Sequence, residues 1–334
     1  MKILLIHAGG TIGMVPSENG YEPKPGFLQG VLSELKDLKS EKMPEITFME
    51  LSPLLDSSDM TVKEWNRIGM AIAQSYDDYD GFVILHGTDT MAYTASALSF
   101  MLENLNKPVI LTGSQIPLCQ VRSDGLDNLV TSLLIAKDAK CKEVCLYFGG
   151  KLIRGNRATK MSADGMRAFS SPNCPLLAEA GIEITYLPTS YAPKSNEKFN
   201  LCLFEDIPIG VLKVFPGIRF PLFEAVMTEK LKGIVIETFG AGNIPGDDDS
   251  LLPIIKKAFN SGSVITVCSQ CPQGTVHLGA YKTSSHLKNA GAVSGFDMTT
   301  ESAVAKLYYL FSKGYSKEEI KAKMEENLRG ELTK

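Results

Sequence analysis

The sequence lacks any long apolar run near its start. The first apolar stretch, residues 3–6, ends at His7, whereas the core of a signal peptide needs about 7–15 apolar residues. No later stretch reaches the roughly 18 apolar residues that a membrane-spanning helix requires. We therefore expect a protein without a leader or a membrane anchor, located in the cytoplasm.

Neither sign of charge dominates the chain. Its 334 residues include 34 Lys and Arg and 38 Asp and Glu, which gives a net charge of -4. There is no basic cluster of the kind that binds nucleic acid and no acidic tract typical of a disordered tail. With 44% hydrophobic and 22% charged residues, the composition is that of a soluble globular protein. A small-molecule substrate is favoured over nucleic acid or membrane.

Cysteine and histidine are sparse and scattered. The seven cysteines are odd in number and lack the spacing of a disulfide framework, which favours reduced thiols. Cys268 and Cys271 form a lone C-x-x-C pair; a zinc site would need a second pair, and Cys141 and Cys145 are one residue too far apart. A redox-active pair remains an alternative to buried, unreactive thiols. The four histidines are dispersed, so the sequence predicts no metal and no cofactor: His7, His86, His277 and His286.

Several motifs of common enzyme classes are also absent. The glycines of the first turn fall at positions 9, 10 and 13, which fits neither the Rossmann spacing nor the Walker A motif. No G-x-S-x-G sequence is present, which argues against a Ser-His-Asp hydrolase with a nucleophile elbow.

Short apolar runs alternate with amphipathic stretches along the chain. Runs that are apolar throughout predict strands buried on both faces, and their alternation with helices predicts parallel sheets covered by helices. The predicted strands are 3–7, 46–51, 82–86, 109–112, 144–148, 211–215, 233–237 and 264–268. The predicted helices lie near 26–38, 61–76, 90–104, 123–138, 221–231, 249–260, 300–313 and 316–328.

A polar, turn-rich segment interrupts this alternation. Residues 188–200 read PTSYAPKSNEKFN, a composition typical of a linker. We therefore predict two α/β domains. The larger, at 1–188, has a mainly parallel sheet with flanking helices; a linker at 189–200 leads to a smaller α/β domain at 201–334.

Small polar residues follow four predicted strands of the first domain. Because ligands bind at the carboxyl ends of parallel strands, we expect these residues to gather at one edge of the sheet. Hydroxyls, N–H groups exposed by glycine, and carboxylates suit hydrolysis of a small substrate that carries an amine. Any one of these hydroxyls could instead be a helix N-cap, but four strand ends agree. The residues are Gly9, Gly10 and Thr11; 56–59; 87–90; and Gly113, Ser114 and Gln115.

A lysine is the candidate base for such a site. Lys160 follows the last predicted strand of the first domain, and a partly buried lysine can act as a base if its pKa falls. Most of the 34 Lys and Arg residues are surface cations, so spacing alone does not single out Lys160.

Motifs along the whole chain resemble the bacterial-type L-asparaginases, and most closely their cytoplasmic type I branch. The two threonine motifs, at Thr11 and Thr88, are highly specific as a pair. The motifs are AGGTIGM (8–14), DSSDM (56–60), HGTDTMAYTASALSFMLENL (86–105), TGSQIPL (112–118), RSDG (122–125), GNRATK (155–160), DMTTE (297–301) and NLRGELT (327–333).

The resemblance implies a two-domain amidohydrolase that converts L-asparagine to L-aspartate and ammonia without a cofactor. Such enzymes form intimate dimers, usually paired into tetramers, with the site at the subunit junction. Thr11 would be the nucleophile, and Tyr21 would polarise its hydroxyl when the loop at 14–27 closes. Thr88, Asp89 and Lys160 would form a second set that activates water or relays a proton. Which threonine attacks first has been argued for the family, and Thr11 is favoured here.

The resemblance also assigns substrate-binding groups. Ser57 and Ser58 would hold the substrate α-carboxylate, and Asp89 its α-ammonium group. The backbone N–H of Thr88 would contribute to the oxyanion hole.

The sequence departs from the family in two places. Ala8 stands where the family usually has threonine, at a position that is not reactive. Some relatives also lend an acid across the dimer to the substrate amine, but residues 269–290 contain no acid. Asn243 of a neighbouring subunit is the candidate that replaces it.

Three other functions stay open from the sequence. A related amidohydrolase could act on glutamine, because one extra methylene is worth only about 1–3 kcal/mol in a pocket. An amidotransferase subunit that acts on amidated glutamyl-tRNA resembles this family but carries an extra N-terminal domain. A non-catalytic ligand-binding homologue is the alternative from a different class.

Overall fold

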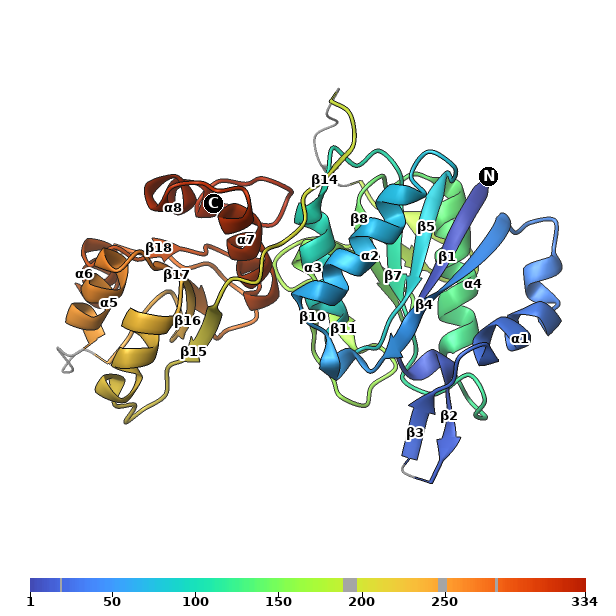
Figure 1. The fold of residues 1–334 in the computed structure, drawn as a ribbon, viewed down its shortest axis with the longest axis horizontal. Coiled ribbons are helices and arrows are strands. Elements are labelled where there is room, and N and C mark those ends of the chain that lie inside the picture. The colour runs from blue at the N-terminus through green and yellow to red at the C-terminus, as the bar shows by residue number, and fades with distance from the viewer. Residues whose placement is uncertain (19, 189–196, 246–250, 280–281) are drawn as a thin grey trace. The chain divides into compact units, whose positions relative to one another are not determined.

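The computed structural model describes residues 1–18, 20–188, 197–245, 251–279 and 282–334. The chain forms two compact units, Met1–Leu203 and Phe204–Lys334 (Figure 1). Both are α/β, and the first has the larger, mainly parallel sheet, so the predicted fold class is confirmed. Of the predicted linker, residues 189–196 lie outside the described residues. Asn200 begins strand β14 (Asn200–Leu201), which pairs with β6 (Leu102–Glu103) of the first unit.

An eight-stranded sheet forms the centre of the first unit. Its strand order is β13-β12-β9-β8-β7-β5-β1-β4, parallel from β4 to β8 and antiparallel beyond. The five parallel strands are the five predicted ones: β1 (Lys2–Gly9), β4 (Glu45–Leu55), β5 (Gly81–Leu85), β7 (Val109–Thr112) and β8 (Val144–Phe148). The antiparallel strands, which the sequence pattern did not predict, are β9 (Lys151–Arg154), β12 (Ala178–Ala180) and β13 (Ile184–Tyr186).

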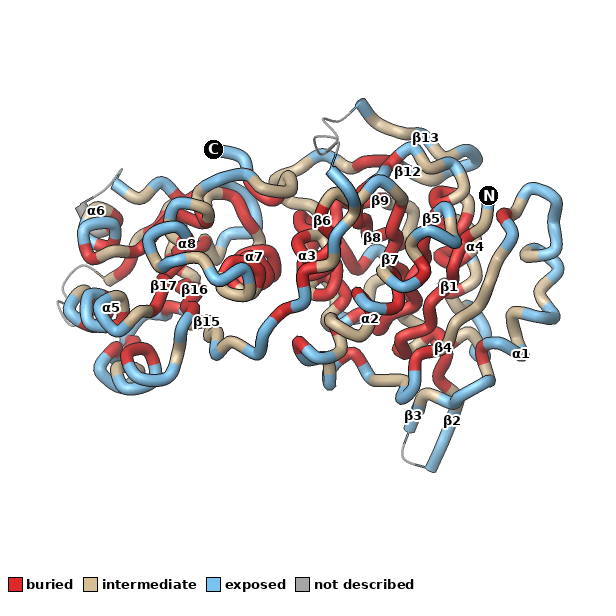
Figure 2. Tube along the Cα trace, turned by 45° about the horizontal axis from the view of Figure 1, so that its top comes forward, coloured by how far each residue is buried: buried red, intermediate tan, exposed pale blue. Residues whose placement is uncertain are grey.

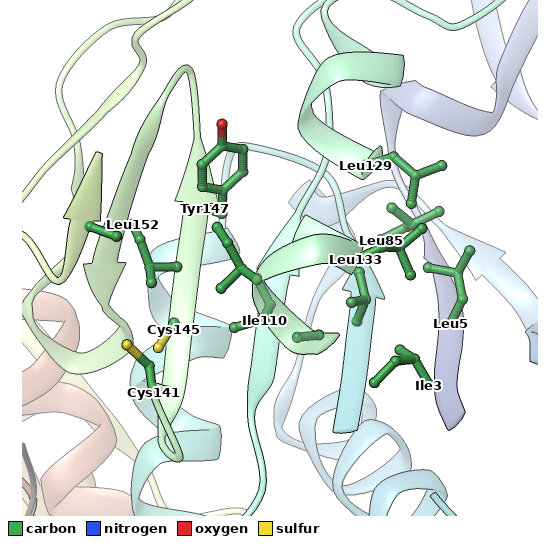
Figure 3. Packing of buried hydrophobic residues seen from close by; sticks show 14 of the residues in the cluster. Ile3, Leu5, Leu85, Ile110, Leu129, Leu133, Cys141, Cys145, Tyr147 and Leu152 are labelled. Carbon is green, nitrogen blue, oxygen red and sulfur yellow. The ribbon is translucent and has the colours of Figure 1, made fainter. Parts of the chain in front are cut away.

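Helices cover both faces of this sheet. Helix α4 (Gly125–Asp138) packs on the face that carries Ile3 and Leu5 (Figure 3). Helix α1 (Phe27–Glu34) contributes Leu28 to the same cluster. Helix α3 (Met91–Met101) packs on the other face, and α2 (Val62–Gln74) packs against α3 (Figure 1). The central strands are buried along most of their length (Figure 2). Each fully buried aliphatic side chain contributes about 1.5–3 kcal/mol.

The strand order places a switch point between β1 and β5. The chain passes from β1 outward to β4 and then returns across β1 to β5, so successive crossovers run in opposite directions. In open α/β sheets the crevice at the carboxyl ends of such strands is where ligands bind. The turns after β1 and β5 carry the two threonine motifs.

Two small antiparallel hairpins extend the first unit. Residues 14–27 were predicted to be a loop, and within it β2 (Met14–Ser17) and β3 (Gly20–Pro23) pair with each other and project from the sheet (Figure 1). The second hairpin pairs β10 (Thr159–Lys160) with β11 (Phe169–Ser170). Short 3-10 turns complete the unit: η1 (Thr11–Gly13), η2 (Asp37–Lys39), η3 (Ser57–Asp59) and η4 (Gly155–Arg157).

The second unit is built on a parallel four-stranded sheet. Its strands, in order, are β15 (Ile209–Lys213), β16 (Gly233–Thr238), β17 (Val264–Ser269) and β18 (Val293–Ser294). The surrounding elements are η5 (Phe220–Phe223), the π-helical turn η6 (Val226–Lys230), α5 (Leu251–Asn260), α6 (Lys282–Asn289), α7 (Thr300–Ser312) and α8 (Lys317–Met324). Within the described ranges, no helix combines the length and hydropathy needed to cross a bilayer.

A buried ion pair ties the C-terminal segment into the second unit. Lys306 of α7 lies 2.5 Å from Glu331, and both side chains are fully buried. Lys306 also donates to the Met324 carbonyl, and Glu331 accepts from the backbone N–H groups of Leu328 and Arg329. Burial lowers the pKa of Lys306, although Glu331 opposes that shift.

Removing one partner of this pair should destabilise the fold more than removing both. Glu331→Ala leaves a buried, unpaired ammonium group and should cost about 3–5 kcal/mol, seen as a lower thermal unfolding midpoint. The double variant Lys306→Met with Glu331→Leu should lose less. Glu318→Ala is the matched control, because Glu318 pairs with Lys317 at the surface and should cost less than about 1 kcal/mol. An unchanged midpoint for Glu331→Ala would contradict this account.

Candidate active site

A pocket of about 220 Å³ opens at the carboxyl ends of the parallel strands of the first unit. All four predicted strand ends contribute to it, as does the β10–β11 hairpin. The lining residues are Gly10, Thr11, Met14, Asp56, Ser57, Gly87, Thr88, Asp89, Gln115, Lys160 and Ala163.

Thr11 stands at the tight turn that follows β1. Gly10 has a φ of 87°, and a Cβ atom there would lie 2.2 Å from the Gly87 nitrogen, so only glycine lets the turns after β1 and β5 approach this closely. Thr11 then begins the 3-10 turn η1. Among the described residues its hydroxyl has no hydrogen-bond partner, so it is available to a substrate.

The turn after β4 supplies Ser57, which is buried and lines the pocket. Asp56 caps the turn and accepts hydrogen bonds from the Ser58 N–H (3.0 Å) and the Ser58 hydroxyl (3.1 Å). Ser58 is thereby bound to Asp56 and is not among the lining residues, whereas Asp56 is. Of the two predicted serines, the structure brings only Ser57 to the pocket wall.

Thr88 lies at the centre of a short polar network. Lys160 Nζ donates to Thr88 Oγ1 at 2.9 Å and to Asp89 Oδ1 at 2.6 Å. Thr88 in turn donates to Gln115 Oε1 at 3.1 Å. The Asp89 side chain is 64% exposed, which leaves its second oxygen accessible. The structure therefore brings together Thr88, Asp89 and Lys160, the set that the resemblance to the family implies.

Gln115 is held in one orientation. Its side-chain Nε2 donates to the carbonyls of Ala163 and Gly165, both at 3.2 Å. Because both of those partners are acceptors, the amide oxygen must face Thr88. Asp124 accepts from the backbone N–H groups of Gln115 and Ile116, each at 3.0 Å, and so fixes the loop itself.

Besides Ser58, two more predicted site residues lie outside the pocket wall. Tyr21, on β3, is 43% exposed, and its hydroxyl accepts a hydrogen bond from Gln120. Asn243 belongs to the second unit, where it forms a β-bridge with Phe239. All lining residues of the pocket come from the first unit.

The sequence reasoning placed Asp56 and Gln115 at this edge of the sheet but gave neither residue a role in the site. The Gln115 side chain is neither a usual nucleophile nor a usual base, and only the packing of the 163–165 segment shows how its amide is oriented. In the part of the chain that the structure describes, no group of three or more His, Cys, Asp or Glu side chains could hold a metal ion.

Family models cover most of the chain. Residues 2–191 match the family model described as "Asparaginase, N-terminal", and residues 208–324 match the "Glutaminase/Asparaginase C-terminal domain". The chain belongs to the asparaginase family.

The full length of this asparaginase-family chain resembles characterised relatives. It is 47% identical to L-asparaginase 1 of Escherichia coli K12 over 332 residues, 99% of this chain and 98% of that one. Its structure superposes on L-asparaginase I of Vibrio cholerae with a TM-score of 0.92 at 46% identity, covering 100% and 99% of the two chains. For the thermostable L-asparaginase of Thermococcus kodakarensis the TM-score is 0.91 at 31% identity, with both chains covered completely.

The close contact between the turns makes Gly10 a sensitive position. We expect Gly10→Ala to reduce thermal stability and disrupt the pocket, because the new Cβ would meet the Gly87 backbone and the backbone conformation of Gly10, with φ 87° and ψ 172°, adds about 1–3 kcal/mol of strain for any other residue. Gly20→Ala is the matched control: its φ of 116° is also positive, but no atom lies within 4 Å of the new Cβ. Equal losses in unfolding midpoint for the two variants would show that the contact with Gly87 is unimportant.

Proposed function

We propose that this protein hydrolyses L-asparagine to L-aspartate and ammonia. The proposal rests on two threonines that line the same pocket but differ in their hydrogen bonding. Thr11 has no intramolecular hydrogen-bond partner among the described residues, whereas Thr88 is bonded to Lys160 and Gln115. The full-length similarity to L-asparaginase 1 of E. coli supports the choice of substrate.

In the proposed reaction the Thr11 hydroxyl attacks the side-chain amide carbon of asparagine. The carbonyl oxygen becomes an oxyanion. The C–N bond then breaks, and the amide nitrogen takes up one proton and leaves as ammonia. Water hydrolyses the resulting ester to aspartate and regenerates Thr11. Thr88 Oγ1 and Lys160 Nζ, which lie 2.9 Å apart, offer a route for the protons. Tyr21 would assist Thr11 once the β2–β3 hairpin closes.

Substrate recognition follows from the charges at the pocket wall. The exposed oxygen of Asp89 suits the α-ammonium group, and Asp56 adds a second negative charge nearby. The Ser57 hydroxyl suits the α-carboxylate, and we assign Ser58 a supporting part through its bonds to Asp56. Asn243 of a neighbouring subunit would complete ammonium recognition in a dimer or homotetramer. We also place the enzyme in the cytoplasm.

Removing either threonine side chain should abolish turnover. Thr11→Ala deletes the attacking oxygen, and Thr88→Val deletes the hydroxyl that contacts Lys160, so each should lower kcat by about 10³-fold or more. Ammonia release from L-asparagine, L-glutamine and D-asparagine measures both activity and substrate choice. Thr185→Val, on the exposed part of β13, is the control.

Near-normal kcat in both Thr11→Ala and Thr88→Val would overturn the assignment of these residues. Absence of ammonia release from all three amides by the folded wild-type protein would overturn the proposed function. Release from L-glutamine at a rate similar to that from L-asparagine would replace the substrate with the broader amide class.

A further inference from the structure

A buried hydrogen-bonded chain runs from helix α2 to the catalytic turn after β5. Trp65 Nε1 of α2 donates to Thr94 Oγ1 of α3 at 3.1 Å. Thr94 Oγ1 lies 2.9 Å from Nε2 of His86, and His86 Nδ1 lies 2.7 Å from the Gly87 carbonyl oxygen. His86 and Thr94 are both fully buried, and the mechanism above uses neither.

Only one assignment of donors and acceptors fits this hydrogen-bonded chain. The Gly87 carbonyl can only accept, so His86 Nδ1 must carry a hydrogen. Burial lowers the pKa of His86 to about 4, against a smaller raising effect of the bond to Gly87, so the ring is neutral and its Nε2 is an acceptor. Thr94 therefore donates to His86 and accepts from Trp65.

The chain ends on a peptide group in the pocket wall. The Gly87 carbonyl and the Thr88 N–H belong to the same peptide unit, and both residues line the pocket. In the described part of the chain, no acceptor is found for the Thr88 N–H. A pocket-lining N–H without an intramolecular acceptor is what an oxyanion hole requires.

Neighbouring residues crowd the turn that holds this peptide, but within the described residues no backbone N–H donates to the Gly87 carbonyl. A Cβ on Gly113 would lie 2.2 Å from the His86 carbonyl oxygen, and a Cβ on Gly87 would lie 2.4 Å from Ser57 Oγ. These short distances show that the turn is closely packed and has no room for a side chain at either glycine. The His86 hydrogen bond adds a directional restraint on rotation of the 87–88 peptide, and it polarises that peptide so that its N–H becomes a stronger donor.

We propose that His86 is a positioning residue, which acts through the Gly87 carbonyl to orient and polarise the Thr88 N–H toward the oxyanion of the proposed amide hydrolysis. Trp65 and Thr94 fix the ring in the tautomer that this task requires. The inference rests on the proposed function, but it concerns a residue that touches neither substrate nor the reacting threonines' hydroxyls.

The decisive comparison is between His86→Leu and His86→Asn. Leucine removes the donor to Gly87, so kcat for L-asparagine should fall about 10- to 100-fold while KM changes little, because the oxyanion exists only after attack. Asparagine places a side-chain N–H near the position of Nδ1 and should restore most of kcat. Thr228→Val removes a buried hydroxyl bond in the second unit and controls for destabilisation.

A pH profile separates positioning from proton transfer. Because the pKa of His86 is about 4, the ring is neutral at working pH, and log kcat against pH should run parallel for the wild type and His86→Asn from about pH 6 to about pH 9. Loss of one limb of the profile in His86→Asn would instead make His86 an acid or base and overturn the proposal.

Other kinetic results would also overturn the proposed positioning role of His86. Wild-type kcat in folded His86→Leu, or failure of folded His86→Asn to recover any of the lost rate, would exclude positioning by this hydrogen bond. If His86→Leu does not fold, Thr94→Val replaces it, with an expected drop in kcat at constant KM and recovery in Thr94→Ser; an unchanged kcat in Thr94→Val then counts against the proposal. Failure of the wild type to release ammonia concerns the proposed function instead.

Discussion

The near-contact between Gly10 and Gly87 is the constraint on which the site depends. Strands β1 and β5 are parallel, hydrogen-bonded neighbours. The turns that follow them lie so close together that neither can carry a side chain at the point of contact. The residues that follow, Thr11 and Thr88, are therefore delivered to the same small space. The position of the pocket is a property of the backbone, and the strand order makes it the switch point of the sheet.

The two threonines differ because their surroundings differ. Thr88 meets a donor, Lys160, and an acceptor, Gln115, whose amide is itself fixed by two carbonyls. Thr11 emerges from a turn stabilised only by backbone, and within the described residues its hydroxyl is left unbonded. Identical side chains thus acquire different chemistry from the groups that adjoin them, which gives the proposed division of labour a physical basis.

Much of this arrangement can be predicted from the sequence, and the limits have physical causes. Four of the five parallel strands are buried on both faces and almost entirely apolar, which made them predictable. The carboxyl ends of the strands placed Thr11, Ser57 and Thr88 at one edge of the sheet, and the resemblance to the family supplied their expected roles. The strands β9, β12 and β13 are short, and long-range pairing decides whether they form. The orientation of Gln115 and the bond between Ser58 and Asp56 depend on contacts that no local pattern encodes.

Apart from the glycines, two residues that line the pocket have apolar side chains without a reactive group. They are Met14 and Ala163. Met14 starts the β2–β3 hairpin, and Ala163 lies in the loop of the β10–β11 hairpin, so each sits on a peripheral segment outside the central sheet. Side-chain volume can change at either place while the glycine contact and the polar network stay intact. Single substitutions at Met14 or Ala163 can therefore change which substrate fits the pocket, while the residues that carry out the reaction stay the same.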